Sequence, residues 1–129
     1  MLSKEELNNL SAIILDACIK VHKEMGPGLL ESIYMLCLAY ELKKRDVNIS
    51  TEVCVPLNYD GIELSKDFRI DILVENEIVI ELKAVEVLLP VHQAQLISYL
   101  KLANKKLGFL INFNVPVLKD GFKRYVNNF

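Results

Sequence analysis

Long apolar runs and cysteine motifs are missing from this chain of 129 residues. Charged residues break its apolar runs well short of the roughly 18 residues that a membrane-spanning helix needs, so we expect no membrane partner. The N-terminus lacks the basic region and apolar region of a secretory signal. The 3 cysteines form no CxxC or CxxH spacing, which argues against a zinc site and a disulfide framework. We therefore expect a cytoplasmic protein with reduced thiols.

A basic surplus is missing as well. The chain has 15 Lys and Arg against 17 Asp and Glu, for a formal net charge of −2 at pH 7. Proteins that bind the phosphate backbone usually carry a basic excess, so any such surface must be local here. Two basic clusters are candidates, with ordinary solvated faces as the alternative: Lys101, Lys105 and Lys106, and Lys119, Lys123 and Arg124. With 52% apolar and 25% charged residues, the composition predicts a soluble globular protein of one domain, residues 1–129.

Helix signals come first in the chain and strand signals follow. Ser3 and Glu6 form a capping box, and apolar residues then recur at helical spacing until Gly26-Pro27-Gly28 ends the helix. The patterns predict helices near residues 3–25, 29–45 and 90–103, and strands near residues 49–57, 62–64, 68–74, 78–84, 107–113 and 122–126. This order, ααββββαββ, indicates an α/β or α+β sandwich.

The segment DFRIDILVENEIVIELKAV predicts a charged β-hairpin. With ENE as the loop, Val74 pairs with Ile78 and Asp71 lies directly across from Glu81, with their Cβ atoms about 5 Å apart. Lys83 points to the same side two residues further on. Alternation also predicts that four apolar residues of the first strand share its other face: Phe68, Ile70, Ile72 and Val74.

Two carboxylates held this close repel each other. At an effective dielectric constant near 20, two unit charges about 4 Å apart cost on the order of 4 kcal/mol. A divalent cation removes this cost, because Mg²⁺ and Mn²⁺ prefer hard oxygen ligands. A lysine beside the metal can orient a water molecule and stabilise charge on a phosphate. The alternative is an amphipathic hairpin whose solvated face carries a weak cross-strand ion pair.

The hairpin acids belong to a set of five blocks in a fixed order. In chain order these are GLLESIY at residues 28–34, which spells GxxExxY, RID at 69–71, ELK at 81–83, QLISYLK at 95–101 and GFLINF at 108–113. Together these blocks resemble the GxxExxY family, a branch of the PD-(D/E)XK nuclease-like superfamily. The resemblance covers almost the whole chain and implies an α/β fold, in which helices flank a mixed central β-sheet of the restriction-endonuclease-like kind. Ile70 stands where the superfamily signature has a proline before Asp71.

The resemblance implies a site for one or two Mg²⁺ or Mn²⁺ ions. Asp71 and Glu81 would be the metal ligands, with the backbone carbonyl of Leu82 as a third, and Lys83 would be the catalytic lysine. Glu31 would approach the metal directly or through water. These roles imply hydrolysis of phosphodiester bonds in DNA or RNA.

Gln95 would reach the same site from the third helix. His92, Gln95 and Tyr99 form a stripe on that helix, at positions i, i+3 and i+7. We favour Gln95 as the site residue of this stripe, and we expect His92 to be an exposed residue of the first turn.

Glu31 and Tyr34 each have a structural alternative. If Gly28 caps the second helix, Glu31 occupies the third helical position, where a glutamate reaches back to the cap N–H and interacts with the helix dipole. Tyr34 follows one turn later, and packing in the core with a tethered hydroxyl accounts for it as well as a role in the site does.

The sequence thus predicts a metal-dependent nuclease that acts on DNA or RNA. The superfamily includes members without catalysis, so the alternative is a silent nuclease-fold module for binding and assembly. The pI near 5.7 and the 52% apolar content support that alternative, and the latter also suggests a homodimer or other homo-oligomer. A third possibility is hydrolysis of a small nucleotide, which needs less basic surface.

Overall fold

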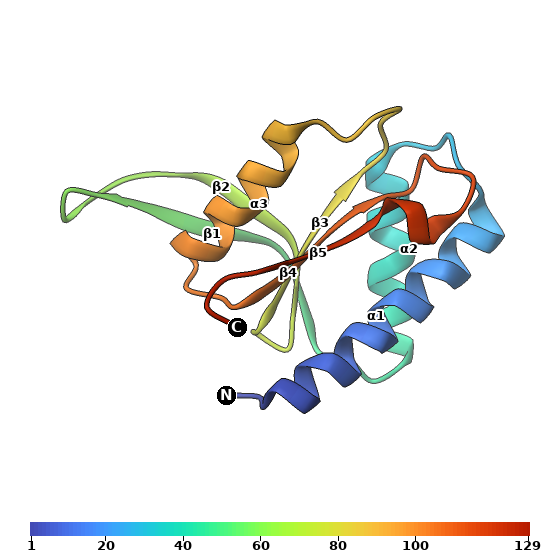
Figure 1. Ribbon diagram of the computed structural model, residues 1–129, viewed down its shortest axis with the longest axis horizontal. Coiled ribbons are helices and arrows are strands. Elements are labelled where there is room, and N and C mark those ends of the chain that lie inside the picture. The colour runs from blue at the N-terminus through green and yellow to red at the C-terminus, as the bar shows by residue number, and fades with distance from the viewer.

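In the computed structural model, strands form one mixed sheet with helices on both of its faces (Figure 1). The structure describes residues 1–64 and 68–129 with their side chains. In chain order its elements are α1 (Lys4–Met25), α2 (Glu31–Lys44), β1 (Ile49–Tyr59), β2 (Ile62–Val74), β3 (Ile78–Lys83), α3 (Pro90–Leu102), β4 (Leu107–Asn112), a 3₁₀ turn (Leu118–Gly121) and β5 (Phe122–Val126).

The sheet has 5 strands in the order β1-β2-β3-β4-β5. Only β3 and β4 run parallel, because α3 carries the chain across the sheet between them, and the other neighbouring pairs are antiparallel. A mixed sheet flanked by helices is the fold that the resemblance implied. The expected strands at residues 62–64 and 68–74 are one strand, β2, because the long β1 pairs with it from Tyr59↔Ile62 to Ile49↔Val74.

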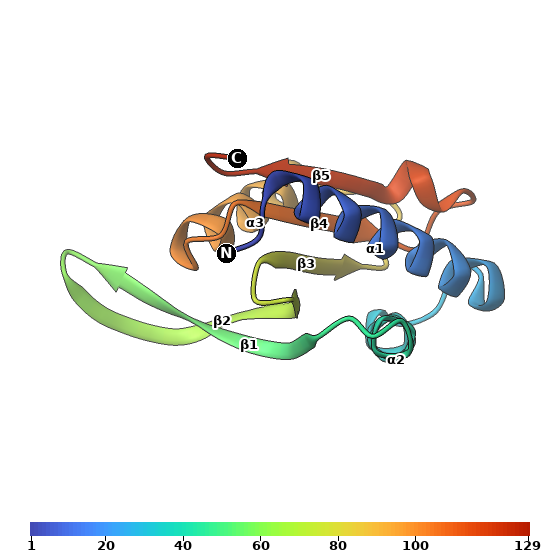
Figure 2. The same cartoon turned by 90° about the horizontal axis from the view of Figure 1, so that it is seen from below.

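Apolar cores fill both sides of the sheet. On one side α1 and α2 pack against strand residues that include Ile72, Ile80 and Ile111. On the other side Leu96 and Leu100 of α3 pack against a second group of strand residues. Figure 2 shows α1 and α3 on opposite faces of β3, β4 and β5. In the described part of the chain, no helix combines the length and the apolar character needed to cross a membrane.

The first and third helices lie where the sequence predicts them, and the second begins later than expected. The capping box of α1 is confirmed, because Ser3 Oγ accepts from the N–H of Glu6 and Glu6 Oε1 accepts from the N–H of Ser3. Gly28 has a φ of 96°, a conformation that favours glycine, and Leu30 is extended. The N-cap of α2 is therefore Leu30, and Glu31 is the first helical residue.

Along the hairpin β1–β2, the alternation of side chains between the two faces of the sheet is interrupted at Glu52 and Asp71. Phe68 and Ile70 pack on the α3 side, whereas Ile72 and Val74 pack on the side of α1 and α2. The prediction that these residues share one face is therefore wrong. Asp71 marks the change on β2, and Glu52, between the two residues that pair with Ile70 and Ile72, has a φ of 51°. Beyond this point the hairpin extends away from the rest of the sheet (Figure 1).

Candidate functional site

The ladder between β2 and β3 stops where the predicted acids face each other. Val74 pairs with Ile78, as predicted, and the pairing continues as far as Ile72↔Ile80. One step further along this register, Asp71 lies opposite Glu81. At this pair, hydrogen bonds from backbone N–H groups to the two carboxylates replace the backbone–backbone bonds of the ladder. The N–H of Asp71 donates to Glu81 Oε1 at 3.2 Å, and the N–H of Leu82 donates to Asp71 Oδ2 at 2.8 Å. Each carboxylate is thus fixed by the backbone of the opposite strand.

The two strands therefore hold two acids together against their mutual repulsion. Burial, followed by the charge of Asp71, raises the pKa of Glu81 to about 8. Burial also raises the pKa of Asp71, although the hydrogen bond from Leu82 and the charge of Lys83 oppose this shift. Carboxyl groups whose pKa is shifted by burial and by a neighbouring charge in this way cluster at functional sites.

Glu31 and Lys83 belong to the same electrostatic cluster. Desolvation raises the pKa of Glu31, Lys83 lowers it, and Asp71 raises it further. The first helical position of α2 carries Glu31, so the alternative in which Glu31 caps the helix from the third position is wrong. Glu31 does lie in the first turn, where the helix dipole favours an acid, as that alternative also stated. The start of α2 thus places Glu31 at the rim of the site, beside the Asp71 carboxylate.

Tyr34 fixes the loop that precedes α2. Its ring is fully buried and stacks on Phe113, with 4.5 Å between ring centroids. Its hydroxyl donates to the carbonyl of Gly26 at 2.5 Å and accepts from the N–H of Leu29 at 3.1 Å. The structure thus confirms the alternative for Tyr34, a residue packed in the core with a tethered hydroxyl. The GxxExxY segment is therefore a positioning unit: Gly28 turns the chain, Tyr34 tethers the turn, and Glu31 is presented at the site.

Removing the tether should loosen this unit. Tyr34→Phe keeps the stacked ring but loses both hydrogen bonds, so we expect the free energy of unfolding to fall by about 1–2 kcal/mol. Urea denaturation measures this change. Tyr40→Phe removes a hydroxyl from an exposed residue of the same helix and should change stability by less than about 0.5 kcal/mol. Equal stability of the Tyr34 variant and the natural protein would contradict the tether.

Helix α3 brings Gln95 and Tyr99 to the other side of the acids. Burial raises the pKa of Tyr99, and the charges of Glu81 and Asp71 raise it further, so its phenol lies close to both acids. Gln95 Nε2 donates to the Tyr99 hydroxyl at 3.2 Å. Gln95 thus reaches the edge of the site through Tyr99. His92 caps α3 instead, because its Nδ1 accepts from the N–H of Leu89 at 3.1 Å, and it is half-buried rather than exposed.

The sequence reasoning missed two residues that belong to this region. Glu52 lines a cavity of about 420 Å³ together with Glu31 and Asp71, and its charge raises the pKa of Asp71. The alternation of strand residues does not predict a role for Glu52. Its position beside Asp71 depends on the interrupted alternation of the β1–β2 hairpin. The carboxamide of Asn112 holds the segment after Lys83, by accepting from the N–H of Val85 and donating to its carbonyl.

The donors present suit a hard cation. Asp71 and Glu81 offer carboxylate oxygens, and Leu82 between Glu81 and Lys83 offers a backbone carbonyl, which are the ligand types that Mg²⁺ and Mn²⁺ take. Within residues 1–64 and 68–129, no group of three or more His, Cys, Asp or Glu side chains is arranged to hold a metal ion. A bound ion would therefore depend on the backbone carbonyl and on water or substrate oxygens to complete its shell.

Comparison with known proteins agrees with this fold. The family model described as the PD-(D/E)XK nuclease superfamily matches residues 8–125, and the chain belongs to this superfamily. The chain is also similar to a solved structure described as "Crystal structure of SSO0001", at 29% identity and a TM-score of 0.52, over 73% of this chain. It spans 47% of that longer chain. No curated protein matches the sequence.

Proposed function

We propose that this protein is a Mg²⁺- or Mn²⁺-dependent nuclease that hydrolyses phosphodiester bonds in DNA, with RNA as the alternative substrate. The observation that carries the proposal is the pair Asp71 and Glu81, whose carboxylates are fixed by backbone N–H groups where the β2–β3 ladder ends. We also assign the chain to the GxxExxY branch, because Gly28, Glu31 and Tyr34 work as one unit around the site.

Each residue of the site then has a chemical task. Asp71, Glu81 and the Leu82 carbonyl would hold the ion, and a divalent ion bound there would supply neutralisation of the phosphate charge and a more acidic water. Lys83 Nζ orients the attacking water and stabilises the charge that develops on the phosphate oxygens. Glu31 and Gln95 complete the pocket from α2 and α3. The buried Ile70 packs in the core where the superfamily signature has proline, so this departure leaves the acids in place.

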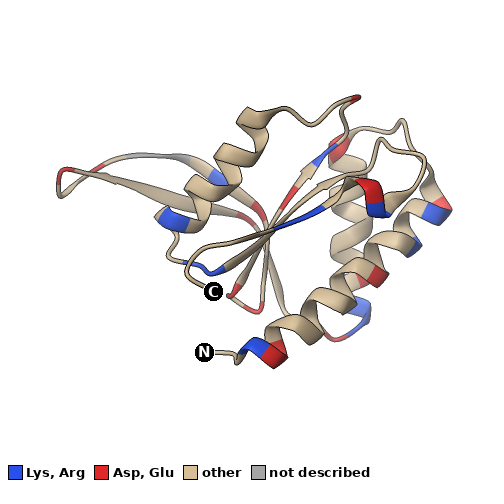
Figure 3. Cartoon of the chain, in the orientation of Figure 1, with Lys and Arg blue, Asp and Glu red and all other residues tan. Residues whose placement is uncertain are grey.

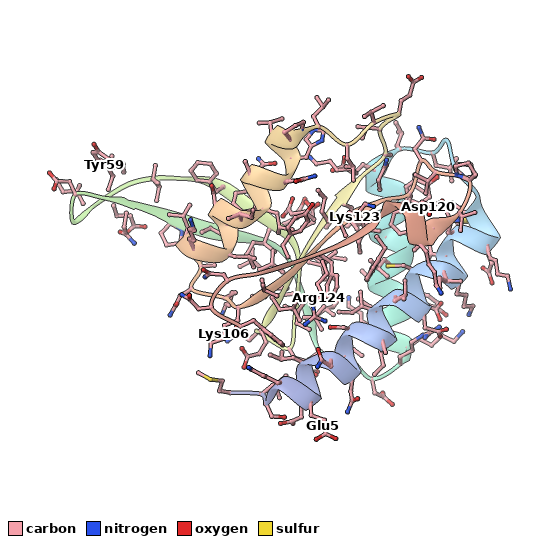
Figure 4. All side chains as sticks on the ribbon, viewed as in Figure 1. Glu5, Tyr59, Lys106, Asp120, Lys123 and Arg124 are labelled. Carbon is pink, nitrogen blue, oxygen red and sulfur yellow. The ribbon has the colours of Figure 1, made fainter. Side chains whose placement is uncertain are left out.

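A calorimetric Mn²⁺ titration followed by a cleavage assay tests the proposal. We expect saturable Mn²⁺ binding to the natural protein, and no binding to Glu81→Ala. Lys83→Ala should bind Mn²⁺ and yet cleave DNA or RNA about 100-fold more slowly or worse, because a group that acts on the developing charge is missing. Lys123→Ala is the matched control, because Lys123 is an exposed lysine on β5 (Figure 4) and its removal should leave kcat unchanged.

The opposite results would overturn the proposal. Absence of both Mn²⁺ binding and cleavage in the natural protein would reject the nuclease. Equal kcat values for Lys83→Ala and the natural protein would reject the role of the lysine.

One observation favours the second candidate function, an assembly module that forms a homodimer. Helix α2 exposes Leu36 and Tyr40, which are 69% and 67% accessible. Both line a groove of about 430 Å³ between α1 and α2, whose mixed charges come from Lys20, Glu24 and Lys44. Exposed apolar residues rimmed by charges are typical of protein interfaces. A protein that neither binds Mn²⁺ nor cuts nucleic acid, and that sediments as a dimer, would favour this function.

For the cellular location we propose the cytoplasm. Cys18, Cys37 and Cys54 are all free thiols, and Cys18 is buried in the core between α1 and the sheet. Free cysteines of this kind are typical of reducing compartments.

A further inference from the structure

An apolar groove adjoins the candidate site on the α3 side of the molecule. It has a volume of about 460 Å³ and lies between α3 and the part of the β1–β2 hairpin that extends from the sheet. Seven side chains line it: Leu57, Phe68, Gln95, Ser98, Tyr99, Lys101 and Leu102. Phe68 and the buried Tyr99 pack edge to face against each other in its wall, with 5.8 Å between ring centroids. Most of the wall is therefore apolar or aromatic, and Gln95 and Ser98 add an amide and a hydroxyl to it.

Tyr99 links this groove to the site. Tyr99 and Gln95 line the groove and are joined by a hydrogen bond, and burial, followed by the charges of Glu81 and Asp71, raises the pKa of Tyr99. A phosphate held at the acids would therefore place the sugar and base of its own or the next nucleotide beside the groove. No other described cavity near the acids has an aromatic wall, because the cavity with Glu31 and Glu52 is lined by Leu30, Ser32 and Met35.

Positive charge borders the groove at the C-terminal end of α3. Lys101 lies in the last turn of this helix, lines the groove and is exposed. Figure 3 shows basic residues at the C-terminal end of α3 and in the loop that leads to β4. In contrast, Arg124 of the second predicted basic cluster is engaged with Asn8 and lies over the Phe129 ring. The local basic surface thus flanks the aromatic groove, as expected for a strand whose bases enter it.

We propose that this groove receives an unpaired nucleobase, so that the enzyme binds and cuts single-stranded segments of nucleic acid. Aromatic faces bind bases of any sequence by stacking, but a base inside a duplex has its faces and its pairing edge already occupied. The amide of Gln95 and the hydroxyl of Ser98 can pair with the exposed edge, while Lys101 contacts a flanking phosphate. This inference rests on the proposed nuclease function and names its substrate.

Fluorescence anisotropy with labelled strands tests the groove without cleavage. The protein carries Lys83→Ala and is saturated with Mn²⁺, and gels confirm that the strands stay intact. We compare a 12-nucleotide oligothymidylate, an abasic strand of equal length and charge, and a blunt duplex. The oligothymidylate should bind about tenfold more tightly than the abasic strand, because only the former offers bases for stacking. The duplex should also bind more weakly than the oligothymidylate.

Substitutions in the groove should remove only the preference for bases. Phe68→Ala takes away an aromatic wall, and Ser98→Phe fills the groove from an exposed helix position that tolerates a larger side chain. Both should reduce the affinity for oligothymidylate to about that for the abasic strand. Tyr40→Ala, which removes an exposed aromatic residue on the opposite helical layer, should leave the preference intact. Lys101→Gln should weaken both strands equally and reduce the salt dependence by about one ion.

The failure of this inference is distinct from failure of the proposed function. Equal affinities for oligothymidylate and abasic strands, tighter binding of the duplex, or an unchanged preference in Ser98→Phe would each overturn the groove proposal. Mn²⁺ binding and cleavage by the natural protein would still stand in those cases. Absence of Mn²⁺ binding and of cleavage would reject the nuclease itself.

Discussion

Glu81→Gln is expected to stabilise the metal-free protein, and the gain should grow with pH. The pKa of Glu81 is raised from 4.5 to about 8 in the folded protein, first by burial and then by the charge of Asp71. Its ionisation therefore costs more in the folded state than in the unfolded chain. A glutamine stays neutral, and its side-chain oxygen can still accept from the N–H of Asp71, as Glu81 Oε1 does at 3.2 Å.

The direction of the pH dependence follows from the upward shift in the pKa of Glu81. The folded state binds a proton at Glu81 more tightly than the unfolded state, so this contribution to stability is complete below about pH 4.5 and is lost as pH rises through about 8. The difference between the variant and the natural protein should therefore be small near pH 4.5 and level off above pH 8. A shift of this size corresponds to a difference on the order of 3–5 kcal/mol at pH 9.

Thermal unfolding from pH 5 to pH 9 in the presence of a chelator measures this difference. At pH 9 the variant should melt roughly 10 °C above the natural protein. Glu86→Gln, which changes an exposed acid on the segment after β3, is the matched control and should show no such trend. Equal melting temperatures for the Glu81 variant and the natural protein at every pH would contradict the raised pKa of Glu81.

If Glu81→Gln both stabilises the protein and abolishes metal binding, Glu81 lowers stability and serves metal binding. A residue selected only for stability would not remain an acid at a buried position beside another acid. The chain carries this cost where the fold holds each carboxylate on a backbone N–H, which is the arrangement that the proposed metal site needs.

The hairpin register could be predicted from sequence for a simple physical reason. Three turn residues between two apolar strands fix the pairing of Val74 with Ile78, and every later pair follows from the two-residue period of a strand. The placement of Asp71 opposite Glu81 therefore needed no information from the rest of the chain. The capping box of α1 was predictable for the same reason, because its two hydrogen bonds join residues three positions apart.

The features that the sequence did not predict depend on contacts between distant residues. The start of α2 is set by the bond from Tyr34 to Gly26 and by the packing of the Tyr34 ring on Phe113, which belongs to the segment after β4. The change of faces at Glu52 and Asp71 requires a positive φ in a strand, for which the glutamate gives no local signal. Both features decide which acids surround the site.

Mn²⁺ binding should strengthen steeply as pH rises towards 8. Glu81 must lose its proton before its carboxylate can bind a metal, and its pKa in the metal-free protein is about 8. Each metal bound below this pH therefore releases about one proton, and the apparent affinity changes by about tenfold per pH unit. Between pH 6 and pH 8 the affinity should rise about 50-fold, and above pH 8 it should change little.

Calorimetry at pH 6, 7 and 8, in two buffers of different ionisation enthalpy, measures both the affinity and the protons released. Glu31→Gln separates two roles of Glu31. The charge of Glu31 is one of the causes that raise the pKa of Glu81, so its removal should weaken the pH dependence. A lower affinity at pH 8 in this variant would show that Glu31 also binds the ion or its water, whereas an unchanged affinity would restrict Glu31 to its electrostatic effect. Mn²⁺ affinity that is independent of pH in the natural protein would contradict Glu81 as a ligand, because a carboxyl group with a pKa of about 8 cannot bind the ion without first releasing its proton.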